Sequence, residues 1–155
     1  MTGDAEKLNL LGMSQGELEA LLADLGEKPY RARQLLQWMY QRGVTDFDAM
    51  TDLSKSLRAK LAQRATISLP RVDSQHESSD GTVKWLFASG SGQRVEAVFI
   101  PEPARGTLCI SSQVGCALDC AFCATGAQGF NRNLTAAEII GQVWHAKAVL
   151  PRRPN

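Results

Sequence analysis

Three closely spaced cysteines are the residues of this sequence that are most clearly suited to chemistry. Cys116, Cys120 and Cys123 stand at C-x-x-x-C-x-x-C spacing. The Gly-rich run 126–130 cannot continue a regular helix or strand, so we expect the three thiols to lie in one loop. Closely spaced thiolates are typical of metal sites. The sequence therefore predicts a metal centre.

The number of thiols favours an iron–sulfur cluster with one open iron. A cubane cluster is normally held by four cysteines, whereas this loop supplies three. An open coordination position is what distinguishes a catalytic metal site from a closed structural one, because a substrate or cofactor is able to occupy it. An iron of this kind is able to bind a cofactor such as S-adenosylmethionine.

Three other interpretations of the cysteines are weaker. A structural zinc site needs further Cys or His ligands at finger spacing, and neither His76 nor His145 stands at such a spacing. A disulfide framework suits a small secreted domain, but we expect no signal peptide here, and the chain has long Leu-rich helical segments. Inert buried cysteines occur singly, not as three within eight residues beside glycines.

A longer stretch around these cysteines resembles a known family. The spacing with Phe122 before the last cysteine resembles the radical S-adenosylmethionine signature. The run from Cys109 to Leu134, with Cys-Ile-Ser-Ser-Gln-Val-Gly-Cys at its start and Gly-Phe-Asn-Arg-Asn-Leu at its end, closely resembles bacterial dual-specificity adenine-C2 RNA methyltransferases. The likeness extends back to the segment Lys28-Pro-Tyr-Arg-Ala-Arg-Gln and forward to Ala136.

The resemblance implies cofactors and partners. A 4Fe-4S cluster on Cys116, Cys120 and Cys123 would bind S-adenosylmethionine, with Phe122 at a cofactor-binding position. The substrates would be 23S ribosomal RNA and transfer RNA, and an electron donor such as flavodoxin would reduce the cluster. An aromatic adenine carbon is not a nucleophile, so its methylation needs radical chemistry from a cofactor.

Two further residues have alternative interpretations. From the residues alone, Glu96 is either an exposed strand carboxylate or one held for chemistry, and Cys109 is a small buried hydrophobe or a reactive thiol. The resemblance implies catalytic roles for both residues. Glu96 matches the family's proton-accepting glutamate, and Cys109 matches its resolving cysteine.

Two alternative functions stay open. One is the related methylation of adenine C8 in ribosomal RNA. The other is a non-enzymatic RNA-binding module that retains a vestigial cluster. Because the family needs a second catalytic cysteine besides Cys109, we expect the chain to be an N-terminal portion that does not methylate RNA by itself.

Composition sets broader limits. The 155 residues are 44% hydrophobic and 21% charged, which is typical of a globular protein with a proper core. No apolar stretch is long enough to span a membrane and the start is too polar for a signal peptide, so we expect a cytoplasmic protein. A net charge of +1 does not by itself indicate that the protein binds nucleic acid.

The first part of the chain has helical periodicity. We expect a loose leader over 1–12, a helix from a Ser14–Glu17 capping box to Gly26, a helix from Pro29 to Gly43, a short turn at 47–50, and a helix over 53–61. Its arginines and lysines are either an RNA-phosphate face or a solvated surface balanced by as many acidic residues.

Alternation then replaces helical periodicity. Residues 83–87 and 95–99 predict a β-hairpin, 73–81 a loop with His76 on the surface, and 107–111 a third strand. A Thr135–Glu138 capping box opens a helix that ends at Pro151, and its predicted apolar face holds Ile139, Ile140, Val143 and Trp144. His145 on this helix is expected to be a packing or surface residue rather than a ligand.

These elements predict an α+β fold in three parts. Residues 1–69 would form a helical accessory domain for RNA recognition, and 70–103 a β-hairpin extension. Residues 104–155 would then form the first βα unit of a radical S-adenosylmethionine barrel, a partial TIM-like barrel. A complete (β/α) barrel takes about 250 residues, so we expect the barrel to be truncated here.

Overall fold

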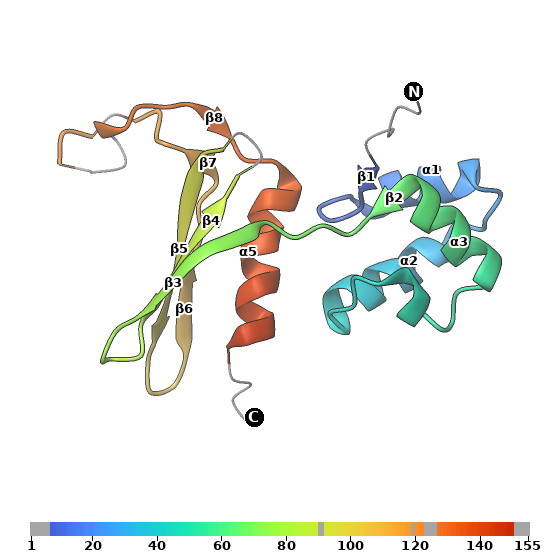
Figure 1. The fold of residues 1–155 in the computed structure, drawn as a ribbon, viewed down its shortest axis with the longest axis horizontal. Coiled ribbons are helices and arrows are strands. Elements are labelled where there is room, and N and C mark those ends of the chain that lie inside the picture. The colour runs from blue at the N-terminus through green and yellow to red at the C-terminus, as the bar shows by residue number, and fades with distance from the viewer. Residues whose placement is uncertain (1–6, 90–91, 119, 123–126, 151–155) are drawn as a thin grey trace. The chain divides into compact units, whose positions relative to one another are not determined.

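The computed structural model describes residues 7–89, 92–118, 120–122 and 127–150. The chain divides into two compact units, Met1–Ser68 and Leu69–Asn155, which are described separately below (Figure 1). A further boundary between residues 103 and 104 stays a prediction, and the strands on either side of it belong to one sheet. Among the described residues, no helix has the length and apolar character needed to cross a membrane.

The N-terminal unit contains the predicted helices. Helix α1 (Gln15–Asp24) begins at the Ser14 cap, where the Ser14 side chain and Glu17 form both bonds of the predicted capping box. Gly26 follows the helix with φ +77°, a conformation that glycine adopts without steric cost. Local sequence signals therefore set both ends of this helix.

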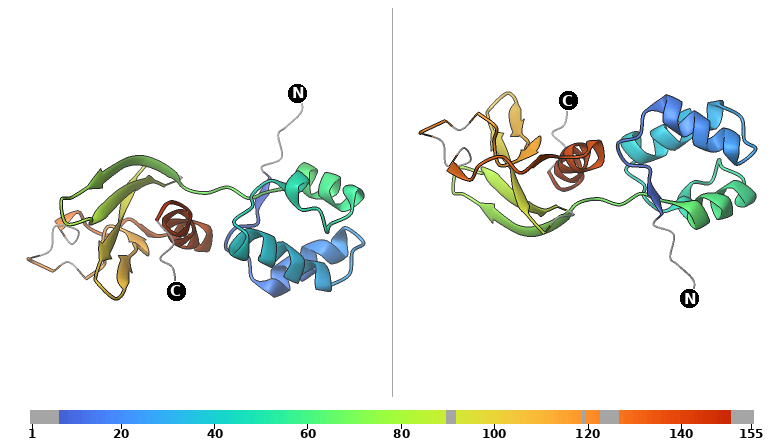
Figure 2. Two further views of the ribbon diagram at one scale, coloured as in Figure 1. Left: turned by 90° about the horizontal axis from the view of Figure 1, so that it is seen from below. Right: turned by 90° about the horizontal axis from the view of Figure 1, so that it is seen from above.

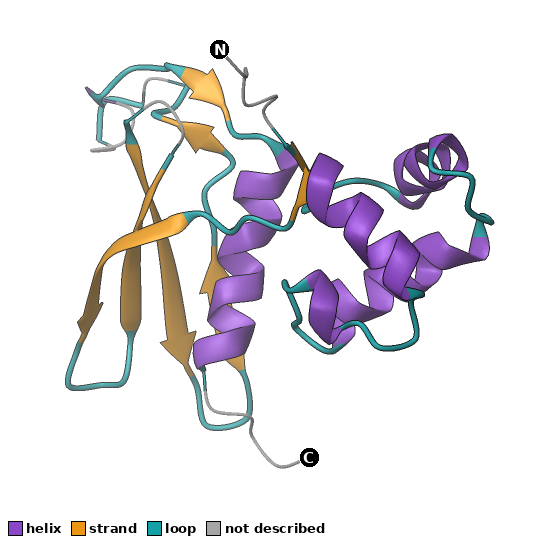
Figure 3. Cartoon of the chain, turned by 45° about the vertical axis from the view of Figure 1, so that its right-hand side comes forward, coloured by secondary structure: helices purple, strands orange, loops and turns teal. Residues whose placement is uncertain are grey.

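The next helical segment is less regular than predicted. Helix α2 (Tyr30–Leu36) continues into a π-helical turn, η1 (Gln37–Gln41), and a 3-10 turn, η2 (Phe47–Ala49), precedes helix α3 (Lys55–Arg64). Figures 2 and 3 show these helices gathered around one another. The buried side chains between them include Leu18, Leu22, Leu35, Met39, Leu57 and Leu61.

A short parallel pair of strands joins the two ends of this unit. Strand β1 (Leu8–Asn9) pairs with β2 (Ala65–Thr66). Leu10 and Leu11, which follow β1, are 0% and 2% exposed. The prediction of a loose leader over 1–12 is thus wrong for these residues, because the strand pairing and the burial of both leucines order them.

The C-terminal unit is built on a four-stranded antiparallel sheet. Its strands lie in the order β3 (Arg71–Glu77), β4 (Val83–Ala88), β5 (Arg94–Pro101) and β6 (Gly106–Cys109). Strands β4 and β5 form the predicted hairpin, and β6 is the predicted third strand, two residues shorter at its end. Because the strand order follows the chain order, each pairing uses a short connection.

Strand β3 corrects the prediction of a loop over 73–81. Residues Arg71–Glu77 pair with β4, with a register irregularity between Val72 and Ser74. The segment lacks a hydrophobic alternation because it is an edge strand with little burial, and the pairing comes from backbone hydrogen bonds. His76 is exposed as expected, but it lies in this strand.

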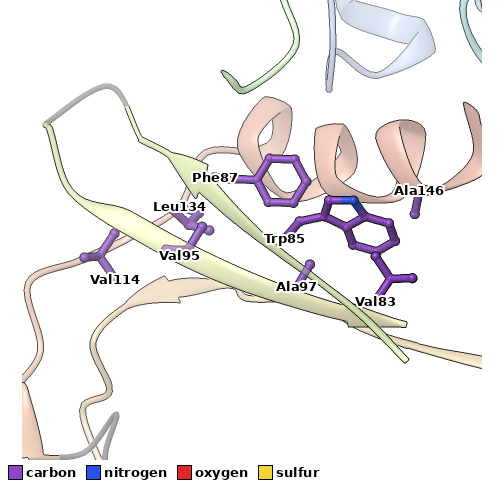
Figure 4. Packing of buried hydrophobic residues seen from close by; sticks show 8 residues of the cluster. All are labelled: Val83, Trp85, Phe87, Val95, Ala97, Val114, Leu134 and Ala146. Atoms are coloured by element: carbon purple, nitrogen blue, oxygen red, sulfur yellow. The ribbon is translucent and has the colours of Figure 1, made fainter. Parts of the chain in front are cut away.

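One face of the sheet packs on helix α5 (Ala136–Val149), which runs alongside the strands in Figure 1 and is seen nearly end-on beside the sheet in Figure 2. Figure 4 shows Trp85 and Phe87 between the strands and the helix. The buried cluster consists of Val83, Trp85, Phe87, Val95, Ala97, Val114, Leu134 and Ala146. The apolar residues of the predicted alternation in β4 and β5 therefore form most of the core of this unit.

The buried face of α5 differs from the predicted apolar face. The capping box of Thr135 with Glu138 is present as expected. However, the buried residues of the helix are Gly141, Gln142 and Ala146, whereas the predicted Ile139, Ile140, Val143 and Trp144 are only half-buried. Of these four, Ile139 packs against the core cluster as predicted. Small residues at the buried positions allow the large aromatic side chains of β4 to fill the space between sheet and helix.

His145 packs in this core, which is one of the two positions expected for it. Its ring meets the rings of Trp85 and Phe87 edge-on, with centroids 5.7 and 5.5 Å away. Its Nε2 atom is buried and has no hydrogen-bond partner within the described part of the chain. Burial without a partner disfavours the charged imidazolium, so the pKa of His145 lies below its ordinary value.

Acidification should therefore destabilise the C-terminal unit. The folded state holds the pKa of His145 below its unfolded value of 6.5, so the unfolded chain binds the proton more readily. The stability that neutral His145 contributes is fully present above the unfolded pKa of 6.5, and it is lost as the pH falls from there towards the folded pKa. Thermal unfolding between about pH 7 and about pH 5 should show a smaller loss of Tm for His145→Phe than for wild type.

A matched variant separates this effect from general acid sensitivity. His76→Gln removes the exposed imidazole of β3 and should keep the wild-type dependence on pH. An identical pH dependence for His145→Phe and wild type would contradict the interpretation.

Candidate functional site

The predicted cysteine loop is closed at its base by a short strand pair. Strand β7 (Gln113–Val114) enters the loop, and β8 (Arg132–Asn133) leaves it in antiparallel pairing. The Asn131 N–H donates to the Val114 carbonyl at 3.0 Å. The two ends of the loop are therefore held together by main-chain hydrogen bonds, whatever the loop binds.

Two glycines allow the strands to approach closely beyond this pair. Gly115 has φ +72°, and the N–H of the next residue, Cys116, donates to the Gly129 carbonyl at 3.3 Å. A Cβ atom on Gly115 would lie 1.7 Å from that carbonyl oxygen. Glycine is thus required at position 115 by both conformation and space.

The structure describes two of the three predicted cluster ligands. Cys116 and Cys120 are half-buried free thiols, while Cys123 lies outside the described residues. Phe122, predicted at a cofactor-binding position, is 94% exposed. Within the described residues, no three Cys, His, Asp or Glu side chains come together as a metal site. Thiols suit iron–sulfur chemistry, so the donors present fit the predicted cluster.

Glu96 lies on the sheet face opposite α5. It alternates along β5 with the buried Val95 and Ala97, and its side chain is 55% exposed. Its Oε1 atom lies 3.2 Å from Nζ of Lys84 on the neighbouring strand. The exposed interpretation of Glu96 matches this geometry, and the carboxylate remains accessible to a bound molecule.

Cys109 faces the same side of the sheet as Glu96. It is exposed at the end of β6, and its cross-strand partner is Val98, two residues from Glu96. Since side chains two residues apart share a face, Glu96 and Cys109 are diagonal neighbours, typically about 7–8 Å apart between backbones. The interpretation of Cys109 as a buried hydrophobe is wrong. Its neighbour Leu108 packs on the core instead.

A pocket of about 610 Å³ links this sheet face to the loop base. Glu96 and Ser111 contribute from the sheet side, and Gly115, Gly129 and Phe130 contribute from the loop. The pocket thus brings together residues that are separated by more than thirty positions in the sequence. It is large enough for a small organic cofactor or a nucleobase.

An ion pair that the sequence reasoning missed attaches the loop exit to α5. Arg132 of β8 donates two hydrogen bonds to the carboxylate of Glu138, at 2.9 and 2.7 Å. These bonds raise the pKa of Arg132. Glu138 also accepts from the Thr135 N–H. The capping box was a sequence signal for Glu138, but nothing in the sequence pattern indicated Arg132 as its partner.

Comparison with known proteins relates this arrangement to RNA-modifying enzymes. The family described as the ribosomal RNA large subunit methyltransferase N-terminal domain matches residues 8–67. The whole chain is 60% identical to a protein of Marinobacter nauticus named dual-specificity RNA methyltransferase RlmN, of which it covers 42%. The chain is a member of the RlmN family. It spans less than half the length of such relatives.

A second relative and a solved structure agree with this membership. The RlmN protein of Saccharophagus degradans is 61% identical over 94% of the chain, which covers 36% of that protein. A crystal structure of a radical SAM methyltransferase from Sphaerobacter thermophilus matches 90% of the chain and 41% of its own, with 45% identity and a TM-score of 0.79. The RlmN-family chain thus has the mixed α/β fold seen in a radical SAM methyltransferase.

Gly115→Ala should disrupt the loop base of this RlmN-family chain. The added Cβ meets the Gly129 carbonyl, and the left-handed conformation alone costs about 1–3 kcal/mol for a residue other than glycine. We expect faster amide hydrogen exchange at Cys116 and Asn131, whose N–H groups bond across the base. Mass spectrometry or NMR of the exchanged chain would measure it.

Gly92→Ala is the matched control. Gly92 has φ +75°, but a Cβ there meets nothing within 4 Å. Gly92→Ala should carry the same free-energy cost of a left-handed alanine, but it should leave the hydrogen bonds of the loop base intact. Equal exchange at Cys116 in both variants would show that the close approach to Gly129 is unimportant.

Proposed function

We propose that this sequence forms the N-terminal part of a radical S-adenosylmethionine enzyme that methylates C2 of adenosine in 23S ribosomal RNA and transfer RNA. The identity of 60% along the whole chain to a dual-specificity RNA methyltransferase carries this proposal. The geometry supports it, because the cysteine loop and Glu96 border one pocket, and Cys109 lies on the same sheet face.

Cys116, Cys120 and Cys123 would hold the 4Fe-4S cluster. The chemistry of the donors supports this assignment, since Cys116 and Cys120 are free thiols on a loop whose ends are already fixed. When bound, the cluster and S-adenosylmethionine supply the radical that an unreactive adenine carbon requires. Phe122 would lie beside this cofactor.

Glu96 and Cys109 would handle the adenine during the reaction. Glu96 would accept a proton from the methylated base, and Cys109 would resolve the covalent link between protein and RNA. Their shared position on the open sheet face supports these roles, because a base in the pocket would be within reach of the Glu96 carboxylate. The methyl-carrying cysteine would be supplied from elsewhere in the enzyme.

Other parts of the proposal concern partners and architecture. The N-terminal unit would contact structured RNA, with its arginines and lysines on phosphates. A reduced flavodoxin or a similar donor would deliver electrons in the cytoplasm. Strand β6, the cysteine loop and α5 would be the first βα unit of a partial barrel, with α5 on its outside.

Anaerobic reconstitution should load one four-iron cluster per chain. Replacement of Cys116, Cys120 or Cys123 by Ala should lower the iron and sulfide content to near zero, because an incomplete set of thiolates does not hold the cluster. Cys109→Ala is the matched control and should retain the cluster. Full iron content in Cys120→Ala, or stoichiometric zinc in the anaerobic wild type, would contradict the assignment.

Glu96→Gln and Cys109→Ala should abolish methylation while keeping the cluster. In a protein of the relatives' full length, loss of a positioned acid–base group lowers turnover by at least about 100-fold. Cys109→Ala should also accumulate protein covalently linked to RNA. Labelled S-adenosylmethionine and nucleoside analysis would measure C2-methyladenosine. Wild-type turnover by either variant, or a C8-methylated product from wild type, would overturn the corresponding part of the proposal.

A further inference from the structure

Gln142 is a fully buried polar side chain in the middle of α5. Its exposed fraction is 0%, in a helix whose other fully buried residues are Gly141 and Ala146. A buried amide is costly unless both its donor and its acceptor are satisfied. The partners of Gln142 therefore show what this position does.

The amide of Gln142 pairs with the main chain of Ser111. The Ser111 N–H donates to Gln142 Oε1 at 2.9 Å, and Gln142 Nε2 donates to the Ser111 carbonyl at 2.8 Å. Nε2 also reaches the carbonyl of Glu138, one turn earlier in the helix, at 3.2 Å. The side chain thus bonds to both main-chain groups of one residue, as a neighbouring strand would.

Ser111 is the point where the chain leaves the sheet for the cysteine loop. Strand β6 ends at Cys109, and β7 begins at Gln113. Continuing the β5–β6 register places Ser111 opposite Glu96, and its Oγ donates to the Glu96 carbonyl at 2.7 Å. Hydrogen bonds therefore run from α5 through Ser111 to the strand that carries Glu96.

We infer that Gln142 is a positioning residue that fixes the entry of the cysteine loop relative to Glu96. Beyond the end of the β5–β6 ladder at Cys109, Gln142 satisfies the two main-chain groups of Ser111, which is partly buried and belongs to no strand. The position of the loop entry relative to the sheet is thereby fixed. The thiols of Cys116 and Cys120 follow Ser111 by five and nine residues. This inference rests on the proposed function, because the cluster is the group being positioned.

Gln142→Leu tests the inference on the 155-residue chain. Leucine keeps a buried side chain of similar size but makes neither bond to Ser111. We expect hydrogen exchange at Ser111 and Cys116, and iron loss from the reconstituted cluster to a chelator, to be about tenfold faster than in wild type. The electron paramagnetic resonance spectrum of the reduced cluster should also broaden, because the loop adopts several positions.

Two further variants make the result specific. Ala146→Gly weakens the same helix at another buried position without touching Ser111. It should keep the wild-type hydrogen exchange at Ser111 and Cys116, and the wild-type iron retention and spectrum of the cluster. Gln142→Asn keeps the amide on a side chain one methylene shorter, which reaches Ser111 less well, so it should lie between wild type and Gln142→Leu. It also serves if the leucine variant does not fold.

The outcomes separate this inference from the proposed function. Wild-type exchange and iron loss in Gln142→Leu, or equal effects from Ala146→Gly, would overturn the positioning role. If the wild type takes up no cluster, the proposed function fails. The exchange at Ser111 and Cys116 in the metal-free chain then decides alone whether Gln142 fixes the loop entry, and an unchanged rate overturns that role.

Discussion

The close packing of α5 against the antiparallel sheet is the contact on which the C-terminal unit depends. The stripe of the helix that includes Glu138, Gln142 and His145 is polar in sequence, at relative positions i, i+4 and i+7. Each residue meets a different part of the unit. Glu138 binds the loop exit, Gln142 binds the loop entry, and His145 packs on the aromatic residues of β4. One helix face therefore orients both the loop and the sheet.

Much of the fold could be predicted because its signals are local. The capping boxes at Ser14 and Thr135 and the alternation in β4 and β5 depend only on neighbouring residues, and the structure contains all of them. The elements that the prediction missed depend on distant partners. Strand β3 is polar because it is an edge strand, and β1 exists because it pairs with β2, more than fifty residues later.

The candidate site was predictable in its residue types but not in its geometry. The cysteine spacing indicates a metal centre without any knowledge of the fold, and the family likeness assigns roles to Glu96 and Cys109. That these two residues share a sheet face follows only from the register of β5 and β6. Gln142 could not be recognised by periodicity, because a polar residue on a helix normally indicates the solvent side.

The β1–β2 pair has a consequence for the N-terminal unit as a module. Because Leu8 pairs with Ala65, the chain enters and leaves this unit at one place. A domain whose ends are adjacent can be inserted, removed or transplanted between proteins with little disturbance of its host. We therefore expect the helical unit, whose buried residues include Leu18 and Leu57, to fold when its two ends are joined to another host.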